Sequence, residues 1–466
     1  MNPIVRFAPS PTGQLHIGGV RTALFNYLFA LKYNGTFLLR IEDTDIARSK
    51  DIYAEQIIES LRWLGFKYQG KPTRQSSRSE RYQEVIEYLL KTGSAYRCFA
   101  TVEELEKLRK KKDNYLYPRI WRNRSEQEID SKLKNKEDYV IRIKIPLNGS
   151  IHFKDIVYGE ISTDCSELDD FIIARSDGTP TYNFTVVVDD YDMKVSHVIR
   201  GEDHISNTPK QILIYDALKW AKPEFAHLPM ILGFDGNRLS KRHGAAGIET
   251  YKNLGYLPHT LINYLALLGW NPGTEDEVFN FQFLMDNFSL EKINKKAAVF
   301  DNKKLVWLSG QHIMKSKSED LLNSIKLLKP DWASGASSDD YLCSIISQLK
   351  GRSKTLVDII NQSEIYFNDP LDYDQKAVVK CWTKDTSELL KSFSEKVLGN
   401  LEWKDESIQR CLNDFSETKR VSKSKLIQPL RVSICGALSG PSMVDLMLVL
   451  GKETCIRRIK NAIKIL

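Results

Sequence analysis

A proline- and glycine-rich turn between two apolar segments constrains the fold of this chain more than any other feature of its sequence. Residues 3–8 form a short apolar run, and residues 9–13 form the turn. Apolar residues then recur at spacings of three and four over 18–33, and a second apolar run occupies 36–41. The two runs are typical of buried strands, and the spacing between them is typical of a helix. The pattern therefore predicts a βαβ unit of a parallel sheet.

The end of this turn also carries residues suited to binding a nucleotide. In a doubly wound sheet the ligand lies beyond the carboxyl ends of the strands, where helix N-termini present free amides to anions. His16, Gly18 and Gly19 fall at this junction, so we expect backbone and imidazole donors to meet phosphates. The G-x-G-x-x-G and G-x-x-x-x-G-K-[ST] fingerprints are absent, which argues against ordinary dinucleotide and P-loop proteins. In isolation, a His-x-Gly-Gly sequence is more often a simple turn.

A second segment, more than two hundred residues later, fits the same task. Arg238, Ser240 and Lys241 lie in a loop that is rich in glycine and contains an Asp-Gly turn. Turn residues on both sides of these cations predict a mobile arm. We expect Lys241 to stabilise the negative charge of a departing pyrophosphate, with Arg238 and Ser240 assisting. A basic loop of this kind is usually a solvated surface segment. Its assignment to catalysis therefore depends on its occurrence together with the first motif.

Length, charge and cysteine usage bound the class of protein. At 466 residues the chain should hold about three or four structural units. Its formal net charge of +7 is too modest to indicate a nucleic-acid partner by itself. No apolar stretch reaches the roughly 20 residues of a membrane span, and no secretion signal is evident, so we expect a cytoplasmic protein without membrane contacts. The seven cysteines lack C-x-x-C spacing, which indicates neither a disulfide framework nor zinc.

Several longer stretches identify a family resemblance. They are RFAPSPTG at 6–13, LHIGG at 15–19, RTALFNY at 21–27, LRIEDTD at 39–45, GTPTYNF at 178–184, VVDD at 187–190 and HVIRGEDH at 197–204. With the Arg238 loop, these stretches resemble bacterial glutamyl-tRNA synthetases, which are class I aminoacyl-tRNA synthetases. The resemblance implies a ligase that uses ATP with Mg²⁺ to attach L-glutamate to the 3′ end of tRNA through a glutamyl-adenylate. It also implies that tRNA must be present before glutamate is activated.

The resemblance further implies an α/β fold in several parts. The expected parts are a Rossmann-like parallel-sheet catalytic domain at 1–78 and 181–230, an inserted domain that binds the tRNA acceptor end at 79–180, a mobile signature loop with a helical stem-contact domain at 231–315, and an all-helical anticodon-binding region at 316–466. We expect the protein to be a monomer.

A glutamate site should contain an arginine for the side-chain carboxylate and an acid for the ammonium group. By resemblance, the glutamate contacts are Arg6, Ser10, Glu42, Tyr182 and Arg200, and the ATP contacts are Thr12, His16, Gly18, Gly19, Asp203 and Lys241. Arg6 and Glu42 lie within apolar runs, where a charge is costly unless it is paired or faces a ligand. The alternative is that these two residues form a structural ion pair. An arginine fork would also reject glutamine, whose amide points donors at donors.

The expected insertion combines basic and aromatic residues. A Thr101-x-x-Glu104 capping box predicts a helix start. Lys110, Lys111 and Arg119 follow among tyrosines and a tryptophan, a composition suited to single-stranded nucleic acid. By resemblance we assign these three basic residues to tRNA binding. A solvated charged helix with an irregular loop explains the pattern equally well. Some relatives bind zinc here through cysteines just after an Ala-Tyr pair, but this chain has only Cys98 there and lacks the later Cys and His partners, so we predict no zinc or other metal site.

The last third of the chain has helical patterns, notably over 339–349, 374–398 and 441–450. By resemblance, Arg352 inspects the third anticodon base and favours C over U, and Lys423 lies in a basic cluster that meets phosphates. The final apolar stripe is predicted to be a packing helix.

Rival functions remain open from sequence alone. One alternative is an enzyme that also, or mainly, glutamylates tRNA-Gln. A relative that glutamylates a modified tRNA base is disfavoured because it lacks the helical region. A small-molecule nucleotidyltransferase would need neither the basic insertion nor the last third of the chain. An inactive RNA-binding relative is disfavoured because the residues assigned to chemistry are all present.

Overall fold

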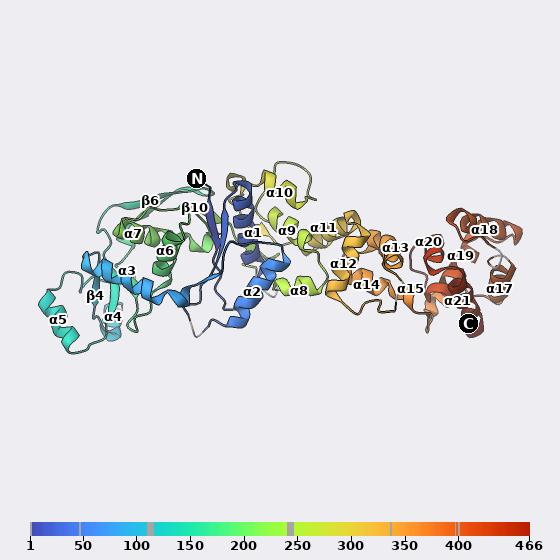
Figure 1. Cartoon of the computed structure of the whole chain (residues 1–466), viewed down its shortest axis with the longest axis horizontal. Coiled ribbons are helices and arrows are strands. Elements are labelled where there is room, and N and C mark those ends of the chain that lie inside the picture. Colours follow the sequence, from blue (N-terminus) through green and yellow to red (C-terminus); the bar gives the residue numbers. More distant parts are fainter. Residues whose placement is uncertain are drawn as a thin grey trace. The chain divides into compact units, whose positions relative to one another are not determined.

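The computed structural model describes residues 2–45, 48–109, 116–239, 247–335, 338–396, 398 and 401–466. They form two compact units (Figure 1). The first unit contains Met1–Thr250 and Leu261–Asn302, and the second contains Tyr251–Thr260 and Lys303–Leu466. The first unit mixes strands and helices, whereas every described element after residue 302 is helical.

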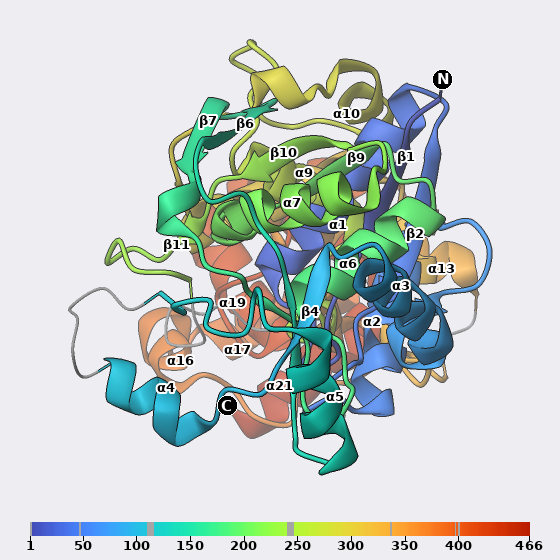
Figure 2. The ribbon, with the colours of Figure 1, turned by 90° about the vertical axis from the view of Figure 1, so that its left-hand side faces the viewer.

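A mostly parallel sheet with one antiparallel edge strand forms the centre of the first unit. Its strands are β1 (Ile4–Phe7), β2 (Thr36–Ile41), β3 (Thr73–Arg74), β6 (Ser150–Asp155), β7 (Gly159–Asp164), β9 (His197–Gly201) and β10 (Glu224–Leu228). β1 pairs in parallel with β2, and β10 pairs in parallel with β6 and β9. The Ser196 amide donates to the Ile4 carbonyl at 2.9 Å, which places β9 beside β1. Figure 2 shows the resulting order β7, β6, β10, β9, β1, β2.

The predicted βαβ unit is confirmed as β1, α1 (Ile17–Lys32) and β2. Val20, Leu24 and Leu28 of α1 are fully buried, because their spacing keeps them on the face that packs on the sheet. The turn from α1 into β2 needs glycine at position 35, since a Cβ there would lie 2.2 Å from the Pro3 carbonyl oxygen. That close approach lets the Thr36 amide donate to the same oxygen at 2.7 Å.

The remaining elements of the first unit cover this sheet or follow it. They are α2 (Asp51–Trp63), α3 (Ser79–Lys91), α6 (Tyr182–Asp192), α7 (Thr208–Leu218), α10 (Phe281–Asn287), β11 (Ile231–Leu232) and β12 (Ala298–Val299). Two more helices, α8 (Ile248–Asn253) and α9 (Pro258–Leu267), contain residues of both units. Figure 2 shows α6 and α7 on the near face of the sheet and α1 on the far face. Helices on both faces explain why the central strands are buried.

A smaller antiparallel sheet lies in the region predicted to be inserted. It consists of β4 (Ala95–Cys98), β5 (Val140–Ile143) and β8 (Ile172–Ala174), accompanied by α4 (Val102–Arg109) and α5 (Glu126–Lys134). The predicted capping box is confirmed: the Glu104 amide donates to Thr101 Oγ1 at 3.2 Å, and the Thr101 amide donates to the Glu104 carboxylate at 3.0 Å.

The hairpin of β6 and β7 also falls within the range 79–180, yet β6 pairs with β10 of the central sheet at Phe225 and Asp155. This hairpin therefore extends the catalytic sheet instead of belonging to the smaller one. The boundaries of the predicted parts stay a prediction.

The second unit is a helical assembly around an aliphatic core. Its helices are α11 (Asn302–Lys315), α12 (Ser318–Leu328), α13 (Asp339–Leu349), α14 (Leu356–Gln362), α15 (Glu364–Phe367), α16 (Gln375–Cys381), α17 (Thr386–Lys396), α18 (Asp405–Thr418), α19 (Lys423–Cys435), α20 (Met443–Leu450) and α21 (Lys452–Ile465). Ile345, Leu430 and Ile459 are among its fully buried residues. Ile459 belongs to the predicted packing stripe of the last helix, which is confirmed. Among the described helices, none has the length and apolar character needed to cross a bilayer.

The helical pattern predicted over 374–398 corresponds to two helices. The structure has α16 and α17 separated by residues 382–385. The Thr383 amide donates to Thr386 Oγ1 at 2.9 Å. This local bond to a side chain competes with helix propagation and favours a turn.

Candidate active site

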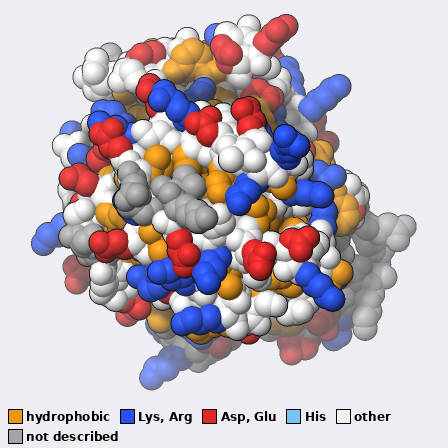
Figure 3. All heavy atoms as spheres, turned by 90° about the vertical axis from the view of Figure 1, so that its right-hand side faces the viewer, with side chains coloured by type: hydrophobic (Ala, Val, Ile, Leu, Met, Phe, Trp, Pro, Cys, Tyr) orange, Lys and Arg blue, Asp and Glu red, His pale blue; other side chains and the backbone are white. Residues whose placement is uncertain are grey.

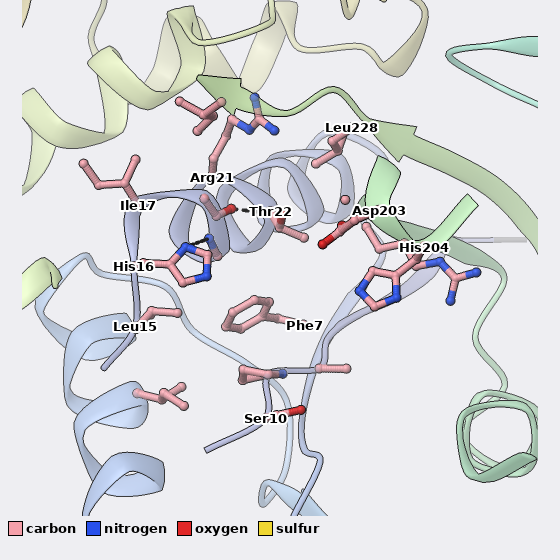
Figure 4. A pocket seen from close by; sticks show the side chains of 18 of the residues that line it. Phe7, Ser10, Leu15, His16, Ile17, Arg21, Thr22, Asp203, His204 and Leu228 are labelled. Carbon is pink, nitrogen blue, oxygen red and sulfur yellow. Dashed lines mark hydrogen bonds between the residues drawn. The ribbon is translucent and has the colours of Figure 1, made fainter. Parts of the chain in front are cut away.

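An open cleft of about 1030 Å³ lies at the ends of β1 and β9. Its wall is formed by the turn before α1, the first residue of α6, the end of β9 and the short hairpin around residue 238. Figure 4 shows His16 and His204 on opposite sides of this cleft, with Phe7 between them. The structure therefore brings together segments that are about two hundred residues apart in sequence.

His16 caps the helix that begins at the cleft. Its Nδ1 accepts a hydrogen bond from the Gly19 amide at 3.2 Å, so the proton of the neutral imidazole is on Nε2. Loss of hydration within the cleft, followed by the positive charge of Arg238, lowers the pKa of His16. A neutral ring with an Nε2–H donor is thus available to an anion.

The glycines after His16 have a different role from the predicted one. The sequence led us to expect a free amide at Gly19, but this amide already donates to the imidazole. A Cβ at Gly18 would lie 3.2 Å from the imidazole ring, so glycine there leaves room for the capping conformation. The first residues of α1 therefore hold His16 in place as well as lining the cleft.

Ser10 and Thr12 lie at the exposed mouth of the cleft. The Thr12 amide donates to the Ser10 carbonyl at 2.9 Å, which closes the tight turn predicted at 9–13. Both hydroxyls belong to residues that line the cleft.

Arg238 extends from a short hairpin at the opposite wall. Its Nη2 lies 3.3 Å from Asp203 Oδ2, and both side chains are exposed. The Leu239 amide donates to the Ile231 carbonyl at 3.0 Å. Ser240 and Lys241 lie outside the described residues. Where the description resumes, the Ile248 amide donates to the Leu15 carbonyl at 3.0 Å, so the residues before and after this stretch are both bonded to the cleft region.

Behind the cleft is a network of buried charges. Arg6 Nε donates to Asp190 Oδ1 at 2.9 Å. Arg40 is fully buried and donates to Asp190 at 2.6 Å and to Glu42 at 3.0 Å. The alternative of an ion pair between Arg6 and Glu42 is thus not what the structure has, because each of them pairs with another residue. Asp189 extends the network by pairing with Arg78 at 2.6 Å.

The network shifts the acidity of its carboxylates in opposite directions. Burial raises the pKa of Glu42, and Arg40 opposes this only in part. Burial acts likewise on Asp190, but Arg6 and Arg40 together lower the pKa of Asp190 below its usual range. Sequence reasoning missed Arg40 and Asp190 as structural partners of the site. The available signal was the same one that identified Arg6, a charge inside an apolar run.

Arg200 is the most unusual cation of the cleft. It is buried, its Nε donates to His227 Nε2 at 3.2 Å, and its Nη2 donates to Thr208 Oγ1 at 2.9 Å. Its Nη1 is buried and has no hydrogen-bond partner among the described residues. No described carboxylate forms an ion pair with it, and burial lowers the pKa of Arg200. A buried cation without a counter-ion is costly unless a ligand supplies one.

Tyr182 and His204 complete this part of the wall. Tyr182 is the first residue of α6, and its hydroxyl lies 3.1 Å from His204 Nδ1. Burial, reinforced by the charge of Arg200, lowers the pKa of His204 to about 4. His204 is therefore neutral at physiological pH and adds no charge to the cleft.

The residues predicted to bind tRNA have diverse surroundings. Lys110 and Lys111 lie outside the described residues. Arg119 donates to Asp170 at 3.3 Å and to the Leu168 carbonyl at 2.9 Å. Asp170 also accepts from Arg122 at 2.7 Å. The Arg119 guanidinium therefore helps to satisfy a buried carboxylate, and its assignment to tRNA stays a prediction.

Arg352 and Lys423 are both exposed in the second unit. Arg352 lines a cavity of about 540 Å³ whose other walls include Asn361, Asp369 and Pro441. Lys423 is the first residue of α19. Figure 3 shows one face of the second unit, on which basic and acidic side chains are interspersed.

Cysteines provide no metal centre within the described part of the chain. All seven are free thiols, and no group of three or more His, Cys, Asp or Glu residues is arranged around a metal position among the described residues. Cys98 Sγ lies 3.1 Å from the Tyr117 hydroxyl and is buried. The absence of zinc stays a prediction.

Comparisons with known proteins give consistent results. The family described as tRNA synthetases class I (E and Q), catalytic domain, matches residues 4–307, and the anticodon binding domain matches residues 321–463. Glutamate–tRNA ligase 2 of Caldicellulosiruptor saccharolyticus is 43% identical over 472 residues, covering 98% of each chain. The glutamate–tRNA ligase of Thermodesulfovibrio yellowstonii is 43% identical over 463 residues, covering 98% of this chain and 99% of its own.

Solved structures agree with these sequence relatives. A glutamate tRNA ligase from Elizabethkingia meningosepticum, crystallised in complex with its amino acid, has a TM-score of 0.91 at 36% identity, and the match covers all of both chains. The predicted α/β catalytic fold followed by a helical anticodon-binding region is confirmed.

Proposed function

We propose, because the chain belongs to the glutamate–tRNA ligases of class I, that its cleft activates L-glutamate with ATP and transfers it to the 3′ end of tRNA. Ligation of glutamate to tRNA is the activity that names the family. The observation that carries the site assignment is Arg200, a buried guanidinium with an unpaired Nη1 and no carboxylate partner among the described residues.

The glutamate pocket follows from the charges around this arginine. Arg200 and Arg6 line the cleft together with Glu42, Ser10 and Tyr182. We assign the unpaired donor of Arg200 to a substrate carboxylate and the Glu42 carboxylate to the substrate ammonium group. Glutamine would direct an amide N–H at the arginine donors and leave a buried guanidinium without an acceptor. Sites of this kind reject the wrong analogue by about 10⁴-fold or more.

ATP binding uses the wall opposite the glutamate pocket. His16 offers its Nε2–H to a phosphate, and Thr12, Gly18, Gly19 and Asp203 also line the cleft. Mg²⁺ that enters with the ATP phosphates supplies further positive charge. These roles were predicted from sequence and are proposals here.

The chemical step joins a glutamate carboxylate oxygen to the α-phosphorus of ATP. The bond between the α-phosphorus and the oxygen that bridges it to the β-phosphate breaks, giving glutamyl-adenylate and pyrophosphate. Negative charge develops on the departing pyrophosphate, and we assign its stabilisation to Lys241 with Arg238 and Ser240. The terminal ribose hydroxyl of tRNA then attacks the mixed anhydride and releases AMP. Catalysis depends on alignment and charge stabilisation, without an enzyme nucleophile.

Recognition of tRNA is assigned to the insertion and to the second unit. We propose that Lys110, Lys111 and Arg119 lie near the acceptor end, and that Arg352 and Lys423 contact the anticodon arm. The donors of Arg352 favour C over U at the third anticodon base. Monomeric state and cytoplasmic location stay predictions.

The test is aminoacylation of purified tRNA-Glu and tRNA-Gln side by side. We expect charging of tRNA-Glu, and the rate with tRNA-Gln decides whether specificity is relaxed. Pyrophosphate exchange should require tRNA. Exchange at full rate without any tRNA, together with no charging of either tRNA, would instead favour a small-molecule nucleotidyltransferase and overturn the proposal.

A further inference from the structure

Three polar side chains form a row across the central sheet behind the glutamate pocket. Asp155, His227 and Arg200 lie on β6, β10 and β9, which are neighbours in that order. His227 is directly paired with Arg200 in the strand register, and Phe225 of the same strand is paired with Asp155. Asp155 and His227 are fully buried, and Arg200 is 5% exposed. The sheet thus connects the β6–β7 hairpin to the cleft through polar groups.

Hydrogen bonding around Asp155 determines the tautomer of His227. Oδ1 of Asp155 accepts from the amides of Val157 and Tyr158 at 2.9 and 2.8 Å. Oδ2 accepts from the His227 amide at 3.1 Å and lies 2.6 Å from His227 Nδ1. A carboxylate surrounded by donors acts as an acceptor, so Nδ1 carries the imidazole proton. Burial lowers the pKa of His227, which keeps the ring neutral.

The neutral tautomer leaves a lone pair on His227 Nε2, and Arg200 Nε donates to it at 3.2 Å. Thr208 Oγ1 accepts from Arg200 Nη2 at 2.9 Å and also lies 3.1 Å from His227 Nε2; the Thr208 hydroxyl can donate instead to the His204 carbonyl at 3.3 Å. These bonds fix two nitrogens of the planar guanidinium, so the orientation of the third, Nη1, is fixed as well. Nη1 is the nitrogen without a partner among the described residues.

The use of a neutral imidazole at this position has an electrostatic reason. A carboxylate in direct contact with Arg200 would neutralise it and compete with the substrate carboxylate. An uncharged acceptor holds the guanidinium without cancelling its charge. Asp155 contacts the other nitrogen of the imidazole, Nδ1, and so orients the ring instead of pairing with Arg200.

We propose that Asp155 and His227 are positioning residues for glutamate: Asp155 fixes the tautomer of His227, and His227 holds Arg200 so that Nη1 faces the substrate carboxylate. This inference rests on the proposed assignment of Arg200 to glutamate. It predicts that changes at Asp155 or His227 weaken glutamate binding while ATP binding is retained.

The first test is Asp155→Asn in the full-length chain. The amide oxygen can still accept from the Val157 and Tyr158 amides, but the NH₂ group then faces His227 Nδ1 and the His227 amide. The imidazole proton would move to Nε2 and oppose the N–H of Arg200. We expect KM for glutamate in aminoacylation to rise about tenfold or more, with KM for ATP within about twofold. Nitrogen-15 NMR of labelled histidines should report the change from an Nδ1–H to an Nε2–H tautomer.

A second pair of variants separates hydrogen bonding from packing. His227→Gln keeps a carbonyl oxygen near the position of Nε2, whereas His227→Leu removes the acceptor altogether. We expect KM for glutamate to be roughly tenfold higher in the leucine variant than in the glutamine variant. Equal values in these two variants would show that only volume matters and would overturn the proposal.

Two further variants serve as controls. Asp170→Asn changes another fully buried aspartate, one that binds Arg119 and Arg122 and does not touch Arg200; it should lower thermal stability without raising KM for glutamate. Arg200→Lys distinguishes the proposed glutamate-binding role of Arg200 from the positioning role of Asp155 and His227. If this variant binds glutamate normally, the proposed function of Arg200 falls. If it binds glutamate poorly but Asp155→Asn and His227→Leu do not, only the positioning role falls.

Discussion

Each of the two units contains a buried arginine, and their surroundings differ in an instructive way. Arg458 of the second unit is 1% exposed. Its Nε donates to Asp369 at 2.8 Å, and its other nitrogens donate to three backbone carbonyls at 2.7 to 2.9 Å, those of Ile365, Ile434 and Asn368. Arg200 of the first unit has only neutral partners and an unpaired Nη1 among the described residues. The charge of Arg458 is compensated within the protein, whereas the charge of Arg200 is left for a ligand to compensate.

The largest expected effect concerns Arg200. Arg200→Met removes the proposed counter-charge for glutamate, and kcat/KM for glutamate should fall by about 10³-fold. Thermal unfolding should change little or shift upward, because an unpaired buried cation is lost. Aminoacylation at varied glutamate concentration and a melting curve measure the two quantities. A large loss of stability with normal kinetics would make Arg200 resemble Arg458 and break the comparison.

Arg458→Met should show the reverse pattern. The substitution leaves three backbone carbonyls without their donor, so the free energy of unfolding should fall by about 3 kcal/mol or more, while KM for glutamate stays unchanged. Asp369 is 30% exposed and keeps Arg457 as a partner. Denaturant titration measures the loss. Arg457 is the matched control, since it also pairs with Asp369 but its side chain is 56% exposed. Arg457→Met should cost less than about 1 kcal/mol.

Arg352 adds an exposed arginine of the second unit to the comparison. Arg352→Gln should raise KM for a tRNA with C as its third anticodon base by about tenfold, leaving KM for glutamate and the melting temperature unchanged. Kinetics with tRNA transcripts that carry C or U at this base test the assignment. The exposed Lys329 provides the control substitution, Lys329→Gln, for a general loss of positive charge. A drop of the same size in both variants would mean that Arg352 contributes only charge.

The last prediction concerns a buried histidine and the pH dependence of stability. Burial, followed by the charges of His259 and Lys315, lowers the pKa of His312 in the second unit to about 4. Between pH 6.5 and 4 the unfolded state binds a proton at this residue that the folded state does not, so stability must fall as the pH falls through this window. His312→Gln should remove about 1–3 kcal/mol of that decline. Denaturant titrations at pH 7 and 4.5 compare the two proteins, and an unchanged pH slope would contradict the assignment.

Local sequence patterns predicted the parts of the fold that depend on near neighbours. The strand at 36–41 and the helix at 339–349 have the predicted bounds, because their apolar periods are strong and uninterrupted. His16 and its capping position were also visible, since one short turn contains every group involved. The interruption of the helix before Thr386 was not predicted. A single hydrogen bond to the Thr386 side chain outweighs the helical spacing of the apolar residues there.

The partners of the site residues could not be predicted in the same way. Arg6 meets Asp190 and Asp155 meets His227 across 184 and 72 residues. Periodicity shows that a charge lies within an apolar run, but it does not show which distant strand or helix supplies the counter-ion. Arg119 illustrates the same difficulty. Its neighbours in sequence suggest a surface that binds nucleic acid, whereas its guanidinium donates to Asp170, which is far along the chain.

The hairpin of β6 and β7 has a consequence for how the protein is made. β6 pairs with β10 through Asp155 and Phe225, which are seventy residues apart in sequence. β1 bonds to Ser196, the residue before β9, which is also far along the chain. During translation each strand can pair early with one neighbour, β6 with β7 and β1 with β2, but its other edge stays open until β10 or β9 has been made. The catalytic sheet closes only once the ribosome has passed β10, and until then the nascent chain depends on its helices and on the smaller sheet for order.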